Sequence, residues 1–332
     1  MRGNRKWLIF AVICICLSTT GCYAGEASQD GKETAEIFAM NTIMDLTVYG
    51  EHSSDILDEA KQIIRQYEQL FSVNVESSDV ARLNKAGGSP VQVSGETYDL
   101  IQESLAISKR TDGLFDISIY PLVRAWGFTT ENYRVPDETE RGNLLGAVGY
   151  SGIQLLGNRT VCLPAQMQID LGGIAKGYLS QKLVGLFQKR EAEAAVISLG
   201  GNVQTFGKKP DGTPFTVGIT DPADGRSLLG TIEVGERAVI TSGSYQRYFE
   251  QDGVVYHHIM DTRTGAPADS DLTSVTVLSD NGECADGLAT ALFVMGKEKA
   301  IAFDRENEDV QCILVDQKNE VWVSEGITFQ KN

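Results

Sequence analysis

The order of helix-like and strand-like segments is the feature of this sequence that most restricts its fold. Amphipathic helical patterns come first, at 55–70 and 98–110. Strand-like runs follow at 194–199, 215–220, 229–234, 237–241 and 273–278, and a hairpin pattern at 312–315 and 320–323 ends the chain. Such a mixture of helix-like and strand-like segments fits a chain with antiparallel sheet. The sequence therefore predicts an α+β fold with mixed or antiparallel sheets and packed helices, rather than a doubly wound parallel sheet.

The N-terminal segment has the composition of an export signal. Residues 1–6 carry three positive charges and residues 7–17 are apolar throughout, an apolar stretch too short to span a bilayer as a mature helix. The segment ends in Gly21-Cys22, which resembles a bacterial lipobox, although Thr19 stands where that motif usually has Leu. We expect a signal peptide at 1–21 and a lipid anchor at Cys22, with a cleaved signal that releases a soluble protein as the alternative.

The residues after the expected anchor predict a tether and then a folded domain. Residues 22–36 are polar and rich in Gly, Ser and Glu, as in flexible linkers. We therefore expect a lipid-anchored flexible tether at 22–36 and one folded domain at 37–332. The expected location is the cell membrane, on its extracytoplasmic side.

The net charge excludes one class of partner. The formal charge is −16. Removing residues 1–21 takes away Arg2, Arg5 and Lys6 and no acidic residue, which leaves about −19. Such a surface repels nucleic acid. The cysteines beyond the signal, at 162, 284 and 312, show neither a disulfide framework nor metal-ligand spacing.

A glycine-rich segment, DLGGIAKGY at 170–178, reads as the end of a strand at 166–170, a tight loop and a helix from 174 onward. A glycine loop that opens a helix offers backbone N–H groups to an anion, and Lys176 adds a positive charge in the first turn. The segment matches neither a Walker loop nor the GxGxxG dinucleotide fingerprint. A purely structural turn is the alternative.

A second segment, at 284–296, reads as a short apolar helix that Gly296 ends. Asp286 and Thr290 are four residues apart, so their oxygens lie on one face of the helix, one turn apart. This pair suits a hard cation such as Mg²⁺. The alternative is that Asp286 satisfies free N–H groups at the helix start and Thr290 bonds back to a carbonyl.

A third segment carries two adjacent histidines, His257 and His258, on an expected strand that runs into a turn. Histidine next to a carboxylate is the composition of a proton-transfer or metal site. In an extended strand His257 would share a side with Ile259. Asp261 could orient an imidazole or close the turn. A hairpin with one histidine facing solvent and the other facing the core is the alternative.

These segments, with several others in the same order, closely resemble the ApbE family of flavin transferases. The resemblance spans nearly the whole mature chain. It rests on AMNT at 39–42, FS at 71–72, SDVARLN at 78–84, GLFDIS at 113–118, PLV at 121–123, WGF at 126–128, DLGGIAKGY at 170–178, ISLGGN at 197–202, TSG at 241–243, YHHI at 256–259 with Asp261 and Thr264-Gly265, and ADGLATALFVMG at 285–296.

The resemblance implies a reaction. Members of the family transfer FMN from FAD to a threonine hydroxyl of another protein and release AMP, with Mg²⁺ stabilising the phosphoryl charge. No segment here resembles the Ser/Thr-Gly-Ala-Thr pattern that the family modifies, so the expected acceptor is another exported protein. The alternatives are a Mg²⁺-dependent FAD pyrophosphatase that yields FMN and AMP, and a lipid-anchored FAD-binding protein without turnover.

The resemblance also implies site residues. It places Mg²⁺ between Asp286, Thr290 and the backbone carbonyl of Gly173. It assigns to FAD the positions of Met40, Leu114, Phe115, Asp116, Asp170, Lys176 and Ile259.

The catalytic base and one FAD contact are further predictions. Because the nucleophile belongs to the acceptor, the chain needs a base, and we predict His257, on the side of Ile259, with His258 as the alternative. Asn74 occupies a position where many relatives carry an aromatic residue beside the flavin. The lost stacking would weaken FAD binding by about 1 kcal/mol, and this favours the hydrolase alternative. Asn41 replaces the usual Gly after Met40, which bears on loop shape only.

Overall fold

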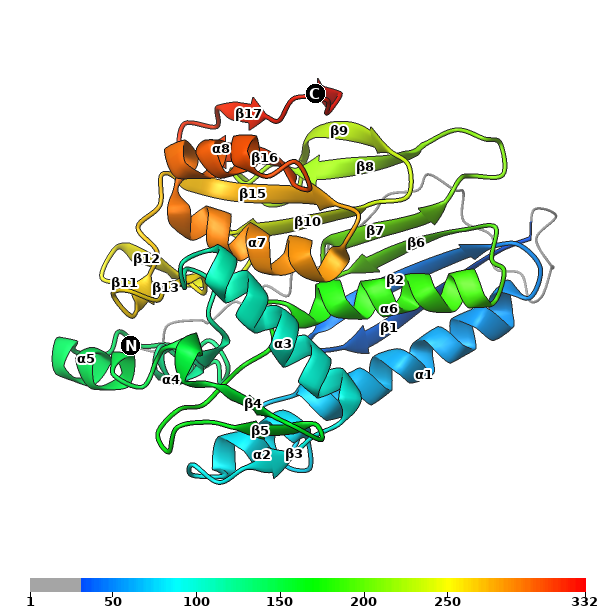
Figure 1. Cartoon of the computed structure of the whole chain (residues 1–332). Coiled ribbons are helices and arrows are strands. Elements are labelled where there is room, and N and C mark those ends of the chain that lie inside the picture. The colour runs from blue at the N-terminus through cyan, green and yellow to red at the C-terminus, as the bar shows by residue number, and fades with distance from the viewer. Residues whose placement is uncertain (1–30) are drawn as a thin grey trace, which may run out of the picture.

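The structure, a computed structural model, describes residues 31–332 (Figure 1). The predicted signal peptide, Cys22 and residues 22–30 of the predicted tether lie outside the described residues. Strand β1 begins at Lys32, so residues 32–36, which the composition placed in the tether, are part of the folded domain. Their pairing with strand β2 (Thr42–Tyr49) explains the difference, because a polar edge strand resembles a linker in composition. In the described part of the chain, no helix has the length and apolarity needed to cross a membrane.

An eight-stranded sheet forms the centre of the molecule, and each neighbouring pair of its strands is antiparallel. This confirms the predicted α+β class with antiparallel sheet. The strands, in their order across the sheet, are β1 (Lys32–Ala39), β2 (Thr42–Tyr49), β6 (Ala194–Leu199), β7 (Asn202–Gly207), β10 (Ala238–Gly243), β15 (Leu272–Ser279), β16 (Gln311–Asp316) and β17 (Val321–Val323).

Helices cover one face of this sheet (Figure 1). Met44, Leu46 and Val48 of β2 alternate with exposed or half-buried residues, and all three are buried in the main hydrophobic core beneath the helices. Predicted helices at 55–70, 98–110, from 174 onward and at 284–295 are confirmed with slightly different ends. The helices are α1 (Ser53–Phe71), α3 (Gly95–Arg110), α6 (Ala175–Lys189), α7 (Gly282–Met295) and α8 (Lys297–Glu306).

A small antiparallel sheet covers part of the opposite face. It consists of β8 (Phe215–Thr220), β9 (Leu228–Val234) and β18 (Phe329–Lys331). Val217 and Ile232 pack with Val239 of the large sheet in a separate apolar cluster. The predicted strands at 215–220 and 229–234 are therefore confirmed, but they belong to a second layer.

A third region carries His257 and His258. Trp126 is buried at its centre, its Nε1 donates to the carbonyl of Gly265 at 2.9 Å, and its ring lies 5.2 Å from that of Tyr256. The region contains η1 (Ile117–Ile119), α4 (Tyr120–Ala125), α5 (Glu138–Leu145), η2 (Tyr150–Gly152), β11 (Tyr248–Gln251), β12 (Val254–His257), β13 (Met260–Asp261) and β14 (Ala266–Pro267). Helix α2 (Asp79–Lys85) and strands β3 (Val91–Gln92), β4 (Gln154–Leu156) and β5 (Thr160–Cys162) lie beside α3.

The predicted strand end at 166–170 is wrong. Residues 166–170 have an irregular backbone, although Ile169 is fully buried. The side-chain amide of Asn84 takes the part of a strand neighbour: its Nδ2 donates to the carbonyl of Ile169 at 2.8 Å and its Oδ1 accepts from the Ile169 N–H at 2.7 Å. A side chain therefore satisfies the backbone that a sheet ladder would otherwise have satisfied.

Candidate functional site

The N-terminus of α6 is the centre of the candidate site, and close contact with α7 fixes its position. A Cβ atom on Gly177 would lie 2.2 Å from the carbonyl oxygen of Gly282 and 2.7 Å from the Cβ of Asp286. Only glycine permits this approach, which explains the last glycine of DLGGIAKGY. The contact brings the beginning of α6 against the first turns of α7.

Asp286 joins the two helices. Its Oδ2 accepts from the backbone N–H of Gly177 at 2.8 Å, and its Oδ1 accepts from Nδ2 of Asn202 on β7 at 3.0 Å. The side chain is 4% exposed. Asp286 therefore satisfies a free N–H group at a helix start, as the structural alternative proposed, but the helix is α6 rather than its own α7.

Thr290, one turn further along α7, points toward β10. Its Oγ1 lies 3.3 Å from Oγ of Ser242. Asn281, rather than Asp286, caps α7 by accepting from the N–H of Cys284. The carboxylate of Asp286, the two hydroxyls and the predicted carbonyl of Gly173 are all hard oxygen donors, so the residues present fit Mg²⁺.

A carboxylate-rich metal cage is absent from the described residues, which contain no group of three or more His, Cys, Asp or Glu side chains able to hold a metal ion. An ion bound here would take one protein carboxylate and complete its coordination from water and substrate phosphates. Mg²⁺ commonly binds in this way.

The first turn of α6 has fewer available N–H groups than the sequence suggested. The N–H of Ala175 donates to the carbonyl of Leu171, and the N–H of Gly177 is taken by Asp286. The N–H of Gly172 donates to Oδ1 of Asp170 at 2.8 Å. Anion binding at this loop would therefore depend more on side-chain charge than on backbone donors.

Charged side chains act on one another near the start of α6. Burial raises the pKa of Asp170, and the positive charges of Arg247 and Lys176 oppose that rise. Burial lowers the pKa of His258, and the same two cations lower it further. The charges of Lys176 and Arg247 thus act on both Asp170 and His258.

The two histidines differ in their surroundings. Nε2 of His257 lies 3.1 Å from the carbonyl oxygen of Ala268, and its ring meets the ring of Phe293 edge-on at 5.4 Å. A carbonyl can only accept, so Nε2 carries the proton and Nδ1 keeps a lone pair. In the described part of the chain, this buried Nδ1 has no hydrogen-bond partner. Burial lowers the pKa of His257.

His258 lies just past the end of β12, where the chain bends. Its Nδ1 lies 3.2 Å from the carbonyl oxygen of Arg247. Burial, followed by the charge of Arg247, lowers its pKa to about 3. Because the strand stops at His257, the alternation that assigned His257 and Ile259 to one side does not extend to Ile259.

Asp261 closes the turn rather than orienting a histidine. Its carbonyl accepts from the N–H of Gly265 at 2.8 Å, and its carboxylate accepts from the N–H and the guanidinium of Arg263. These hydrogen bonds lower the pKa of Asp261 despite its burial. The turn interpretation is confirmed.

The segment containing Leu114, Phe115 and Asp116 packs against the glycine loop. The ring of Phe115 lies 3.3 Å from where a Cβ on Gly173 would stand, and the N–H of Asp170 donates to the carbonyl of Ile117. Phe115 is buried and Leu114 half-buried. Ile259 is 3% exposed, within the main core.

The carboxylate of Asp116 is anchored within its own segment. Its Oδ1 accepts from Ser118, and its Oδ2 accepts from the N–H of Tyr150 at 2.7 Å. Burial raises the pKa of Asp116, and these hydrogen bonds oppose the rise. Asp116 therefore links η1 to η2 at this edge of the site.

Met40 lies in the two-residue turn between β1 and β2. Met40 and Asn41 both have positive φ, at 49° and 60°, as in a type I′ hairpin turn. A left-handed methionine is strained, and an external contact supports it: the Met40 N–H donates to Oε1 of Glu68 on α1 at 2.7 Å. Asn41 suits the turn because asparagine tolerates this conformation.

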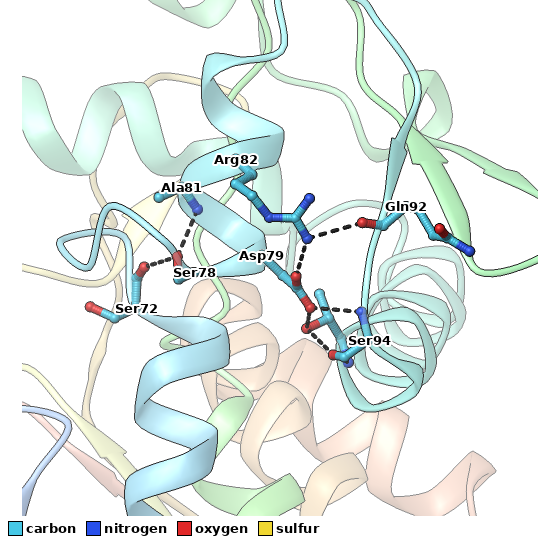
Figure 2. Close-up of polar contacts among 8 residues, drawn as sticks. Ser72, Ser78, Asp79, Ala81, Arg82, Gln92 and Ser94 are labelled. Atoms are coloured by element: carbon cyan, nitrogen blue, oxygen red, sulfur yellow. Dashed lines mark hydrogen bonds and ion pairs between the residues drawn. The ribbon is translucent and has the colours of Figure 1, made fainter.

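Asn74 lies on an exposed loop between α1 and α2. Figure 2 shows how the loop is held: Ser78 donates to the carbonyl of Ser72 and accepts from the N–H of Ala81. Asp79 accepts from the N–H of Ser94 at 2.8 Å, which ties α2 to the start of α3. The loop thus has fixed ends, and the side chain of Asn74 is at the surface.

Sequence reasoning missed Asn202, Ser242, Arg247 and Gly177 as site residues. Polar side chains in ISLGGN and TSG, two of the quoted motifs, were the available signal for Asn202 and Ser242. Arg247 precedes the histidines by ten residues, and the β11–β12 hairpin folds it back beside His258.

Comparisons with known proteins identify the family of this chain. The ApbE family model matches residues 40–314. A FAD:protein FMN transferase of Klebsiella pneumoniae is 37% identical, over 82% of this chain and 86% of its own. One of Treponema pallidum is 32% identical, over 97% and 94%. The crystal structure of the ApbE protein of Thermotoga maritima superposes with a TM-score of 0.83 at 34% identity, over 89% of this chain and 97% of that one. The chain described here therefore belongs to the ApbE family.

Proposed function

We infer that this protein is a FAD:protein FMN transferase that moves FMN from FAD to a threonine hydroxyl of an exported acceptor protein. Its relatives of 37% and 32% identity carry that name. The observation that carries the inference is the convergence of hard oxygen ligands and cations at one helix start. Asp286 accepts from the N–H of Gly177 in the first turn of α6, Thr290 lies one turn further along α7, and the charges of Lys176 and Arg247 act on Asp170 in the loop before α6.

The reaction needs stabilisation of phosphoryl charge. The threonine oxygen of the acceptor would form a bond to the FMN-side phosphorus of FAD while the bond to the bridging oxygen breaks and AMP leaves. A bound Mg²⁺, held by Asp286, Thr290 and the Gly173 carbonyl, supplies charge stabilisation at the phosphates. Lys176 and Arg247 offset further negative charge, and the flavin-side contacts predicted are Met40, Leu114, Phe115, Asp116 and Ile259.

We propose His257 as the group that accepts the threonine proton. Both histidines have lowered pKa values, so both are neutral near pH 7 and able to accept a proton. His257 keeps an unpartnered Nδ1 lone pair. His258, whose pKa is lowered to about 3, is a much weaker base, and the positive charge of Arg247 disfavours its protonation.

We also propose that the protein acts outside the cytoplasm, anchored by a lipid on Cys22. The support is the order of basic, apolar and Gly-Cys segments at 1–22. An exported enzyme meets exported acceptors.

The test is an incubation of the purified protein with FAD and Mg²⁺, with and without an acceptor domain that carries a Ser-Gly-Ala-Thr segment. We expect covalent flavin fluorescence on the acceptor and release of AMP, both lost when a chelator is added. Thr290→Val should lower the rate at least about tenfold, whereas Thr290→Ser should retain most of it, because serine keeps the hydroxyl ligand.

Other outcomes identify the alternatives. Free FMN and AMP without labelled acceptor would indicate a pyrophosphatase, and intact FAD would indicate a binding protein. Either result contradicts the transferase assignment.

A further inference from the structure

Two large apolar side chains are exposed beside the turn that carries Met40. Phe38 of β1 is 70% exposed and Ile43 of β2 is 39% exposed, and the two residues are direct cross-strand partners. Neither belongs to the apolar cluster beneath the small sheet, which includes Tyr49 at the far end of β2. Among the described residues, Phe38 is therefore largely open to solvent and Ile43 partly so.

An acidic pair lies next to the apolar pair. Glu36 and Asp45 are the next partners on the same face, since side chains alternate along each strand. Both residues are exposed. Partial burial and then the negative charge of Glu36 raise the pKa of Asp45. The surface thus offers an apolar contact and, beside it, excess negative charge that a cation would neutralise.

The same segment is the edge of the large sheet. Within residues 31–332, β1 pairs only with β2. In a two-residue hairpin the flanking pair, Ala39 and Thr42, exchanges hydrogen bonds. Counting back from it, Thr34, Glu36 and Phe38 direct their backbone N–H and C=O groups away from β2, and all three are exposed. Such an edge can accept an added strand.

We propose that this edge binds the segment of the acceptor protein that carries the modified threonine, paired with β1 as an added strand. An apolar side chain of the acceptor contacts Phe38 and Ile43, and a Lys or Arg lies against Glu36 and Asp45. The inference rests on the proposed transferase function. Because Phe38 precedes Met40 by two residues, a strand paired to this edge would end close to one of the expected flavin contacts. A second copy of the chain is disfavoured as occupant because each mature chain would carry a charge of about −19.

The experiment compares two acceptor domains with the same Ser-Gly-Ala-Thr segment, one flanked by Lys and Val and the other by Glu and Ser. Flavin transfer to each is measured over a range of acceptor concentrations. FAD affinity is measured separately by fluorescence. The variants are Phe38→Ser, Glu36→Lys and Thr34→Pro. The proline removes only a backbone N–H group that points away from β2. The matched control is Leu228→Ser on β9, where Leu228 is 47% exposed.

We expect the wild-type protein to prefer the Lys-Val acceptor. Phe38→Ser and Thr34→Pro should raise the acceptor KM about tenfold at unchanged FAD affinity. Glu36→Lys should reverse the charge preference between the two acceptors. The control Leu228→Ser should behave as wild type. If the three variants transfer flavin with the wild-type KM for the acceptor, the docking inference is wrong but the transferase function stands. The same conclusion would follow from a wild-type dimer that Phe38→Ser dissociates without a change in transfer. A wild-type protein that labels neither acceptor would overturn the transferase function itself, and the inference with it.

Discussion

At the scale of single residues, His257 and His258 show how neighbours in sequence receive different chemistry from the fold. His257 packs against Phe293 of α7 and donates to a carbonyl, whereas His258 faces the cations Arg247 and Lys176. Burial is the largest cause of the lowered pKa in both. Nearby positive charges lower the pKa further only at His258. The position of those charges comes from the fold and cannot be seen in the sequence.

The lowered pKa of His258 makes stability depend on pH. Its folded-state pKa is about 3, against an ordinary value of 6.5. Between these values the unfolded chain binds a proton that the folded chain does not, so the stability is complete above pH 6.5 and is lost as pH falls toward 3. We expect His258→Asn to flatten the loss of unfolding free energy below pH 6.5, by up to about 1.4 kcal/mol per pH unit.

Urea titrations at pH 7, 6 and 5 measure this slope. The control is His52→Asn, which replaces an exposed histidine at a left-handed position that asparagine tolerates. The control should keep the wild-type slope. A His258→Asn variant with that same slope would show that His258 is not buried in its neutral form.

Asn74 permits a clean test of flavin stacking. It is exposed on a loop whose ends are fixed by Ser78 and Asp79, so a larger side chain meets no buried neighbour. We expect Asn74→Tyr to tighten FAD binding about fivefold, since stacking contributes about 1 kcal/mol, and to favour transfer over hydrolysis. Fluorescence titration measures the affinity, with Asn74→Ala as the control for loss of the amide. Equal affinities in all three proteins would mean that position 74 points away from the flavin.

At the scale of elements, the crossing of α6 and α7 determines the candidate metal site. Asp286 reaches Gly177 only because two glycines, Gly177 and Gly282, allow the helices to touch. The glycine-rich sequence thus serves helix packing as much as ligand binding. The catalytic geometry depends on that packing, because Thr290 lies on the same helix as Asp286.

Gly177→Ala should separate these helices. The new Cβ would stand 2.2 Å from a backbone carbonyl, so α6 must shift, and we expect a loss of about 1–3 kcal/mol in unfolding free energy and of nearly all activity. Gly185→Ala, on the exposed side of the same helix with no heavy atom within 4 Å, is the matched control. It should gain about 0.5–1 kcal/mol and keep activity. Chemical denaturation and the transfer assay measure both effects, and similar behaviour of the two variants would refute the packing argument.

At the scale of the whole molecule, the predicted site residues come from segments that lie far apart in sequence. The turn after β1, the loop before α6 and the first half of α7 come from residues 40, 172–173 and 286–290. Helices on one face and the small sheet on the other bury the middle of the large sheet. The N-terminal segment concerns the location of this domain relative to the membrane.

The anchoring prediction concerns Cys22. Cys22→Ala should leave the protein without a lipid and move it from the membrane fraction to the soluble fraction, because the lipid is the predicted anchor. Cys16→Ala, within the apolar part of the signal, should leave lipidation unchanged. Membrane fractionation and mass spectrometry of the mature N-terminus provide the measurement. A mature protein that begins elsewhere than residue 22 contradicts the anchor but not export.

Periodicity was sufficient for most of the elements. Buried stripes such as Ile56, Ala60 and Tyr67 predict a helix because side chains three and four residues apart share a face. Alternating or continuous apolar runs likewise predicted β6, β8 and β15. The segment at 166–170 was predicted incorrectly because its backbone partner is the Asn84 side chain, more than eighty residues earlier. No local pattern records such a contact.

The sequence by itself determined the fold class, the family resemblance and the residue types of the candidate site, since these depend on local order and short motifs. Only the tertiary structure decided which partner each side chain meets. It placed Asp286 on the N-terminus of α6, Asp261 in its turn, and Arg247 beside His258. The physical reason is that charge, burial and hydrogen bonding act through space between segments that chain order leaves far apart.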